Sequence, residues 1–171
     1  MIKICKYSLL LTFLLCFSSL EAQQVHAFRD IRGEVTLCDS NKTIAVLYRE
    51  DCCCACMQSL CNFLQAICDE RNIRFAVMLS GKGDIAMRRM TTANAQGYFA
   101  ANNKPYFVYD YSLNNQKSYS KKFRISNFPA ILLFSPNQKN PSYISYSQIF
   151  TNDEDLLNKT FIKKIQNFIS N

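Results

Sequence analysis

The chain has 171 residues, of which 49% are hydrophobic, enough to fill the core of a single domain. It carries 20 Lys and Arg residues against 13 Asp and Glu residues, a formal net charge of +7. The charges are scattered, and the adjacent basic pairs lack the interleaved aromatic residues of a nucleic-acid-binding face. We therefore expect a solvated basic surface and no nucleic-acid partner.

The first 22 residues have the pattern of an export signal. Two lysines precede the apolar run at 8–20, which is too short to span a bilayer, and Ala22 offers a small residue for cleavage. We expect residues 1–22 to be a signal peptide and residues 23–171 to form one domain. The mature protein would then be periplasmic or in the cell envelope, and not an integral membrane protein.

Strand-like and helix-like patterns alternate along the rest of the chain, after residues 23–33, which have no clear periodicity. Apolar runs and alternation predict strands at 33–38, 43–48, 73–79, 106–109, 131–134 and 143–146. Helical spacing and capping residues predict helices at 54–70, 84–95, 117–124 and 153–169. Strands alternating with helices favour an α/β fold with a central sheet.

Four cysteines in five residues follow the 43–48 strand and precede the next helix: Cys52, Cys53, Cys54 and Cys56. A disulfide needs Cα atoms roughly 4.4–6.8 Å apart, which residues three apart in the first turn of a helix satisfy. Cys53 and Cys56 can therefore pair as a C-x-x-C motif. Cys52 and Cys56 remain a second possible pair if Cys52 lies inside the helix.

The start of this helix favours a reactive sulfur at Cys53. Unpaired backbone N–H groups and the positive end of the helix dipole stabilise a thiolate there, and the thiolate is the nucleophilic form. A buried Cys56 would stay protonated until Cys53 forms a mixed disulfide, and would then attack it. Removing Cys5 and Cys16 with the signal reduces nine cysteines to seven, so at least one must stay unpaired within the chain or bind something.

The strand, C-x-x-C motif and helix resemble the thioredoxin superfamily. A second segment, Phe123-Arg124-Ile125-Ser126-Asn127-Phe128-Pro129-Ala130-Ile131-Leu132-Leu133-Phe134, resembles the thioredoxin stretch that leads through a cis-proline into a buried strand. The resemblance implies that Pro129 is cis and faces the Cys53 sulfur. It also implies that Phe128 offers its backbone to a substrate, so that both residues bind substrate.

The helix at 84–95, the strand at 106–109 and the segment at 31–37 make the chain similar to the exported, TlpA-like branch of redoxins. This resemblance implies a thioredoxin-like fold: a central mixed sheet flanked by helices, with a β-α insertion and an N-terminal strand. The implied function is thiol–disulfide exchange with protein thiols, with catalytic Cys53 and Cys56. It requires an unidentified redox partner and no cofactor.

The turn that carries Cys52, Cys53, Cys54 and Cys56, called the cysteine turn below, also departs from the family pattern. Cys52 replaces the usual aromatic residue, and Cys54-Ala55 replaces a pair such as Gly-Pro. Leu47 stands where thioredoxin has a buried acid, and Ser59 where many TlpA-like proteins have a glutamate. Fast reductase turnover is therefore not implied. Cys52 and Cys54 are possible auxiliary thiols, and Cys54 could react with either Cys53 or Cys56.

Two other interpretations stay open. The C-x-x-C cysteines could form a structural disulfide or buried thiols in a redox-inactive member of the family. Alternatively, the thiolates of Cys52, Cys53, Cys54 and Cys56 could bind copper or zinc. Copper-delivering Sco-type relatives also need a distant histidine, and none follows His26. The two remaining cysteines of the helix, Cys61 and Cys68, are expected to pack in the core.

Overall fold

The computed structural model describes residues 26–30, 35–38, 41–80, 93–98, 105–112, 118–136, 138, 140–151 and 156–171. The expected signal peptide lies outside these residues. So does most of the helix expected at 84–95, of which only residues 93–95 are described; residues 93–96 are helical. Within the described part of the chain, no helix is both long and apolar enough to cross a membrane.

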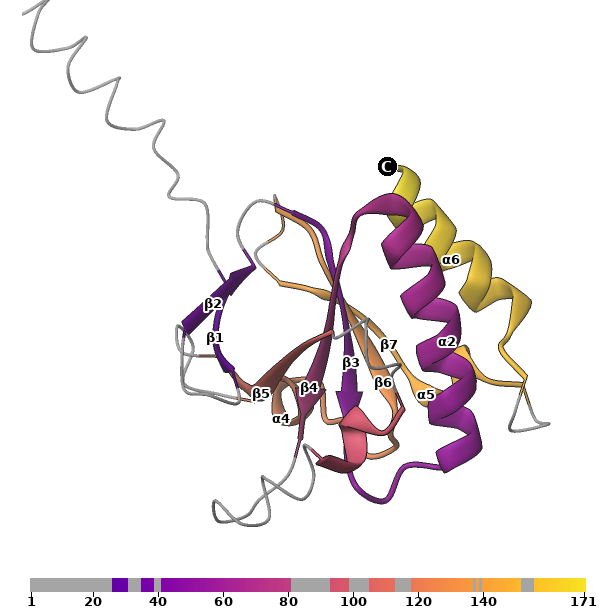
Figure 1. Ribbon diagram of the computed structural model, residues 1–171, viewed down its shortest axis with the longest axis horizontal. Helices are drawn as coiled ribbons and strands as arrows, with labels where there is room; N and C mark the ends of the chain where they lie inside the picture. The colour runs from indigo at the N-terminus through magenta and orange to yellow at the C-terminus, as the bar shows by residue number, and fades with distance from the viewer. Residues whose placement is uncertain are drawn as a thin grey trace, which may run out of the picture.

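The described strands form one seven-stranded sheet in the order β2-β1-β5-β4-β3-β6-β7. The strands are β1 (His26–Asp30), β2 (Val35–Cys38), β3 (Thr43–Tyr48), β4 (Arg74–Leu79), β5 (Tyr106–Ser112), β6 (Ala130–Phe134) and β7 (Ser142–Ile144). Figure 1 labels the helices α2 (Cys54–Arg71), α4 (Tyr119–Lys122), α5 (Tyr146–Ile149) and α6 (Lys159–Ser170).

The sheet is mixed and is built around β3, whose six residues are all buried. β3 runs parallel to β4 and antiparallel to β6, and β4 runs parallel to β5. Because a strand buried on both faces needs a near-continuous apolar run, the sequence Thr43-Ile44-Ala45-Val46-Leu47-Tyr48 suits this central place. The predicted α/β architecture with a central mixed sheet is confirmed.

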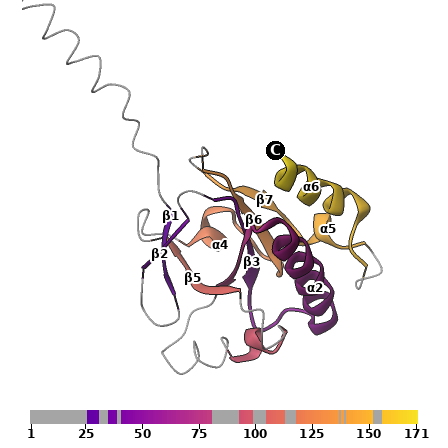
Figure 2. The ribbon, with the colours of Figure 1, turned by 45° about the horizontal axis from the view of Figure 1, so that its top comes forward.

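Helices cover both faces of the sheet. α2 and α6 lie together on one face and α4 lies on the other, as Figures 1 and 2 show from two directions. The ring of Phe63 in α2 meets that of Phe161 in α6 at 5.8 Å. On the other face, the Tyr119 ring of α4 lies 5.8 Å from Phe28 of β1 and 5.6 Å from Phe134 of β6. These aromatic contacts fix the layers around the sheet.

Residues 23–33 have no clear periodicity in the sequence, yet residues 26–30 form β1. This strand pairs antiparallel with β2 on one side and with β5 on the other. Its strand conformation is therefore stabilised by two neighbours and does not require an alternating pattern of its own.

Two boundaries near the C-terminus differ from the prediction. The strand expected at 143–146 is β7, which ends at Ile144, and Tyr146 begins the short helix α5. The closing helix begins at Lys159 rather than near 153, because the Asn158 side chain caps it by accepting the Thr160 N–H at 2.9 Å. Leu157 instead forms a β-bridge with Phe150.

Candidate thiol site at the start of helix α2

A tight turn joins β3 to α2 and buries the first cysteine. The Cys52 N–H donates to the Arg49 carbonyl at 3.0 Å, and the Arg49 N–H donates to the Cys52 sulfur at 3.4 Å. Cys52 is only 7% exposed. Burial raises the pKa of the Cys52 thiol to about 12, so this sulfur stays protonated at neutral pH.

Cys53 is the N-cap of α2. Its backbone has φ −58° and ψ 122°, and its sulfur accepts the Cys56 N–H at 3.4 Å. An oxygen of Ser, Thr, Asp or Asn usually has this role, satisfying one of the N–H groups that have no partner inside the helix. The half-buried Cys53 sulfur therefore lies where N–H groups and the helix dipole favour negative charge.

Cys56 lies one turn further along α2 and is completely buried. Its sulfur is 3.3 Å from the hydroxyl oxygen of Tyr146, the first residue of α5, and either group can be the donor. Cys53 and Cys56 are thiols in this structure, as are Cys52, Cys54, Cys61 and Cys68. The C-x-x-C motif thus combines an accessible sulfur with a buried one.

The other sulfur of the cysteine turn has a separate environment. Cys54 is exposed, and its sulfur accepts a hydrogen bond from the Tyr98 hydroxyl at 3.3 Å. Burial raises the pKa of Tyr98 most, and the hydrogen bond to Cys54 raises it further. Tyr98 therefore keeps its proton and remains the donor at neutral pH. Within the described residues, no three His, Cys, Asp or Glu side chains converge closely enough to hold a metal ion.

Cys61 and Cys68 pack in the core, as predicted. Each is 1% exposed, and burial raises the pKa of each thiol to about 12. The sulfurs at the very start of α2 are therefore accessible, Cys53 in part and Cys54 fully, whereas Cys56, Cys61 and Cys68 further along it are enclosed.

The pairing of β3 with β6 brings the residues around Pro129 to the cysteine turn; residues 126–129 are called the proline segment below. Leu47, one residue before the end of β3, is the partner of Ala130 at the start of β6. Pro129 directly precedes Ala130, so it lies beside the end of β3, where the turn begins. The Phe128–Pro129 peptide bond is cis, as the resemblance implied, and both residues are buried.

Arg49 connects this segment with the turn. Its guanidinium lies over the Phe128 ring, 4.3 Å from the centroid, and donates to the Ser126 carbonyl at 3.4 Å. Two further hydrogen bonds join it to the Asp51 carboxylate and together make a salt bridge. The hydrogen bond from Arg49 lowers the pKa of Asp51, so the pair stays ionised at neutral pH. Residues 77 positions apart in sequence are therefore held together beside the thiols.

A buried carboxylate supports the proline segment from the opposite face. Asp110 of β5 is 6% exposed and accepts the Tyr119 N–H at 2.7 Å and the Ser120 N–H at 3.1 Å. The Ser80 hydroxyl also donates to it, at 3.2 Å. Asp110 thereby satisfies the first N–H groups of α4, the helix that leads directly into the residues before Pro129.

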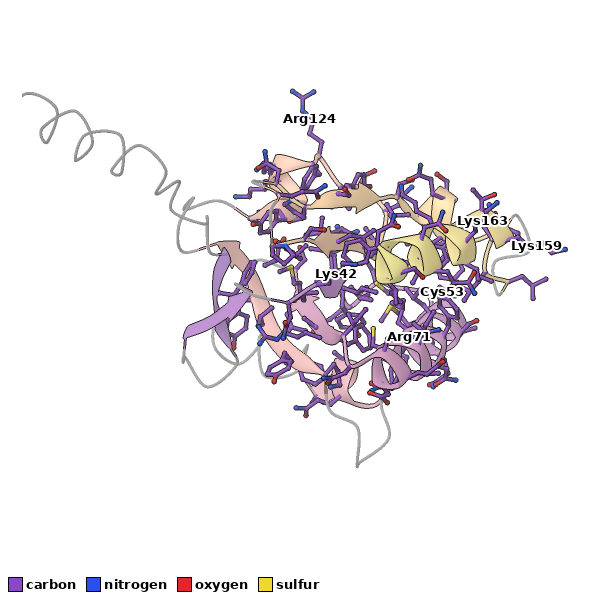
Figure 3. The ribbon with its side chains drawn as sticks, turned by 90° about the horizontal axis from the view of Figure 1, so that it is seen from above. Lys42, Cys53, Arg71, Arg124, Lys159 and Lys163 are labelled. Atoms are coloured by element: carbon purple, nitrogen blue, oxygen red, sulfur yellow. The ribbon has the colours of Figure 1, made fainter. Side chains whose placement is uncertain are left out.

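The labelled basic residues do not gather around the thiol site. Figure 3 shows Arg124 pointing outward at one side of the molecule and Lys159 and Lys163 pointing outward from α6 at another. Lys42 and Arg71 instead line an open cavity of about 330 Å³ near the start of β3, at the opposite end of that strand from the cysteine turn. This dispersal matches the predicted solvated basic surface.

Sequence reasoning identified the cysteines, Phe128 and Pro129, but missed Arg49, Tyr146 and Asp110. A signal existed for Tyr146: Ser145 and Gln148 form a capping box, which predicts a helix start at Tyr146. No sequence pattern indicated Arg49 as a link to the proline segment, because Ser126 and Phe128 are distant from it in the sequence.

No protein-family model matches the sequence, and no curated protein matches it. Solved structures do match the arrangement of the chain. A thiol-disulfide oxidoreductase from Bacteroides fragilis has a TM-score of 0.56 at 11% identity, over 86% of this chain and 98% of that one. An exposed lipoprotein thioredoxin from Streptococcus pneumoniae has a TM-score of 0.53 at 12% identity, over 84% and 98%.

The chain has the thioredoxin fold. A third similar structure of this fold is BsSco, a member of the Sco family of cytochrome c oxidase assembly proteins, with a TM-score of 0.51 at 15% identity over 86% of this chain and 93% of that one. At these identities the likeness concerns the fold. In the thioredoxin fold of this chain, the start of α2 and the segment before β6 lie beside each other through the β3–β6 pairing.

Proposed function

We propose that this protein is an exported thiol–disulfide oxidoreductase that exchanges disulfides with protein thiols. Cys53 is the nucleophile, Cys56 is the resolving thiol, and Phe128 and Pro129 position the substrate. The observation that carries the proposal is the contrast between two cysteines one turn apart: a half-buried sulfur at the N-cap of α2 and a completely buried one behind it. This asymmetry is what separate attacking and resolving steps require.

The reaction has two exchange steps. The Cys53 thiolate attacks a substrate disulfide, forming a mixed disulfide and releasing one substrate thiolate. Cys56 then attacks the Cys53 sulfur, releasing the second substrate thiolate and leaving a Cys53–Cys56 disulfide. Two electrons pass from the protein to the substrate, and an unidentified redox partner restores the dithiol. The same steps in reverse oxidise a substrate dithiol.

Insulin reduction with dithiothreitol as the electron source tests the cysteine assignment. We expect Cys53→Ser to abolish the activity. Reduced Cys56→Ser, mixed with insulin after the dithiothreitol has been removed, should form a lasting mixed disulfide that mass spectrometry detects. Cys68→Ala, which removes a thiol from the far end of α2, is the matched control and should retain activity. Equal activity in Cys53→Ser and the unmodified protein would remove Cys53 from the mechanism.

Export is tested separately. The full chain should be recovered from the envelope fraction of a bacterial host with its N-terminus at Gln23, determined by mass spectrometry of the intact protein. Recovery from the cytoplasm with residues 1–22 still attached would contradict the proposed location without affecting the exchange chemistry.

A further inference from the structure

The hydroxyl of Tyr146 lies 3.3 Å from the sulfur of Cys56. We propose that Tyr146 is a catalytic residue of the resolving step, taking the proton that Cys56 must lose when its sulfur attacks the mixed disulfide. This inference rests on the proposed exchange function and adds to it the group that activates the buried thiol.

The resolving thiol needs such a group because of where it lies. Cys56 is completely buried, and burial disfavours the charged form of a thiol. Leu47, at the position of the buried acid in thioredoxin, is apolar and also completely buried. Among the described residues, the one buried carboxylate is Asp110, and its oxygens accept hydrogen bonds at the start of α4, on the opposite face of the sheet.

The Tyr146 hydroxyl is held in place by the structure around it. The Tyr146 ring packs on Phe150 at 5.0 Å, and Phe150 is itself 3% exposed. The helix start is fixed by the capping box, in which the Ser145 N–H donates to the Gln148 side chain at 3.0 Å. Tyr146 is only partly buried, in contrast to the completely buried Cys56.

The step balances with the groups present. The Cys56 sulfur bonds to the Cys53 sulfur as the bond from Cys53 to the substrate sulfur breaks. The substrate leaves as a thiolate and takes a proton from water. The Cys56 proton passes to the Tyr146 oxygen while the Tyr146 hydroxyl proton passes to water. Tyr146 is unchanged at the end, and Cys53 and Cys56 are joined by a disulfide.

The test separates the two exchange steps in single turnovers. The reduced full-length protein is mixed with oxidised glutathione and quenched with acid at successive times. Peptide mass spectrometry then quantifies the Cys53–glutathione adduct and the Cys53–Cys56 disulfide. The variants are Tyr146→Phe, which keeps the ring that packs on Phe150, and the control Tyr143→Phe, which removes a hydroxyl from the adjacent β7.

In Tyr146→Phe we expect the adduct to form at an unchanged rate and to resolve roughly a hundredfold more slowly, the low end of what proton transfer by a positioned group contributes. Tyr143→Phe should match the unmodified protein. An unchanged resolving rate in Tyr146→Phe, or an equal slowing of both steps, would overturn the role of Tyr146 while leaving the exchange function in place. Absence of any Cys53 adduct in the unmodified protein would instead overturn the exchange function, and the role of Tyr146 with it.

Discussion

The guanidinium of Arg49 lies 4.3 Å from the centroid of the Phe128 ring. Arg49 belongs to the turn that holds the cysteines, and Phe128 precedes the cis-proline beside β6. A planar guanidinium can stack on an aromatic ring and pair with a carboxylate in the same orientation, which a lysine ammonium cannot do. This one side chain therefore contacts both halves of the proposed site, in addition to the β3–β6 pairing that brings them together.

We expect Arg49→Lys to reduce insulin reduction several-fold, mainly through a higher KM, because the segment at 126–129 loses its fixed position against the turn. The free energy of unfolding should fall by only about 1 kcal/mol or less, because the Arg49 side chain is 39% exposed and surface cation–π and ion-pair contacts are weak. Arg124→Lys is the matched control, since Arg124 lies in the loop that holds Ser126 and Phe128 but points outward. Equal KM values for Arg49→Lys and the unmodified protein would contradict the positioning role.

The cysteines should differ in their reaction with iodoacetamide. At pH 8 a thiol with a pKa of about 12 is ionised in only about one molecule in ten thousand, and the thiolate is the form that reacts. In the reduced, folded protein we expect labelling of Cys53 and Cys54 but not of Cys52, Cys61 or Cys68. Peptide fragmentation after labelling with and without urea measures this. Rapid labelling of Cys52 in the folded protein would show that its sulfur is not enclosed.

The same buried thiols should make the fold sensitive to alkali. Burial raises the pKa of Cys68 from 9.0 to about 12, so between these values the unfolded chain loses a proton that the folded chain keeps. Stability is therefore fully present below pH 9 and decreases as the pH rises toward 12, by up to about 1.4 kcal/mol per pH unit for each such thiol. Urea unfolding at successive pH values should show a shallower decrease for Cys68→Ala than for the unmodified protein. Parallel pH profiles would contradict the burial of this thiol in the folded state.

The sequence predicted those features that depend on local patterns. The apolar run at 43–48 and the helical spacing after Cys54 each specify an element on their own, so the cysteine turn was located correctly between β3 and α2. The predicted strand at 143–146 includes Tyr146, but the capping box that begins α5 at this residue outweighs the strand pattern. The contacts of Arg49 with Ser126 and Phe128 depend on the β3–β6 pairing, a long-range arrangement that no short segment specifies.

Asp110 also escaped the sequence analysis, because a single acid inside an apolar strand has no pattern of its own. It is 6% exposed and accepts hydrogen bonds from Tyr119, Ser120 and Ser80. We expect Asp110→Ala to lower the free energy of unfolding by about 2–4 kcal/mol, because two N–H groups of α4 and the Ser80 hydroxyl lose their acceptor inside the protein. Asp110→Asn, which keeps one acceptor oxygen, should cost about half as much. Urea unfolding at pH 7 measures both.

Ser118→Ala provides the comparison for this prediction. The Ser118 hydroxyl also caps α4, accepting the Lys121 N–H at 3.3 Å, but Ser118 is only partly buried, so its loss should cost about 1 kcal/mol or less. Since α4 leads into the segment before Pro129, Asp110→Ala should reduce insulin reduction at temperatures where the variant is still folded, and Ser118→Ala should not. If Asp110→Ala destabilised the protein no more than Ser118→Ala, the buried carboxylate would not be what fixes α4, and the proline segment would have to be positioned from the Arg49 side alone.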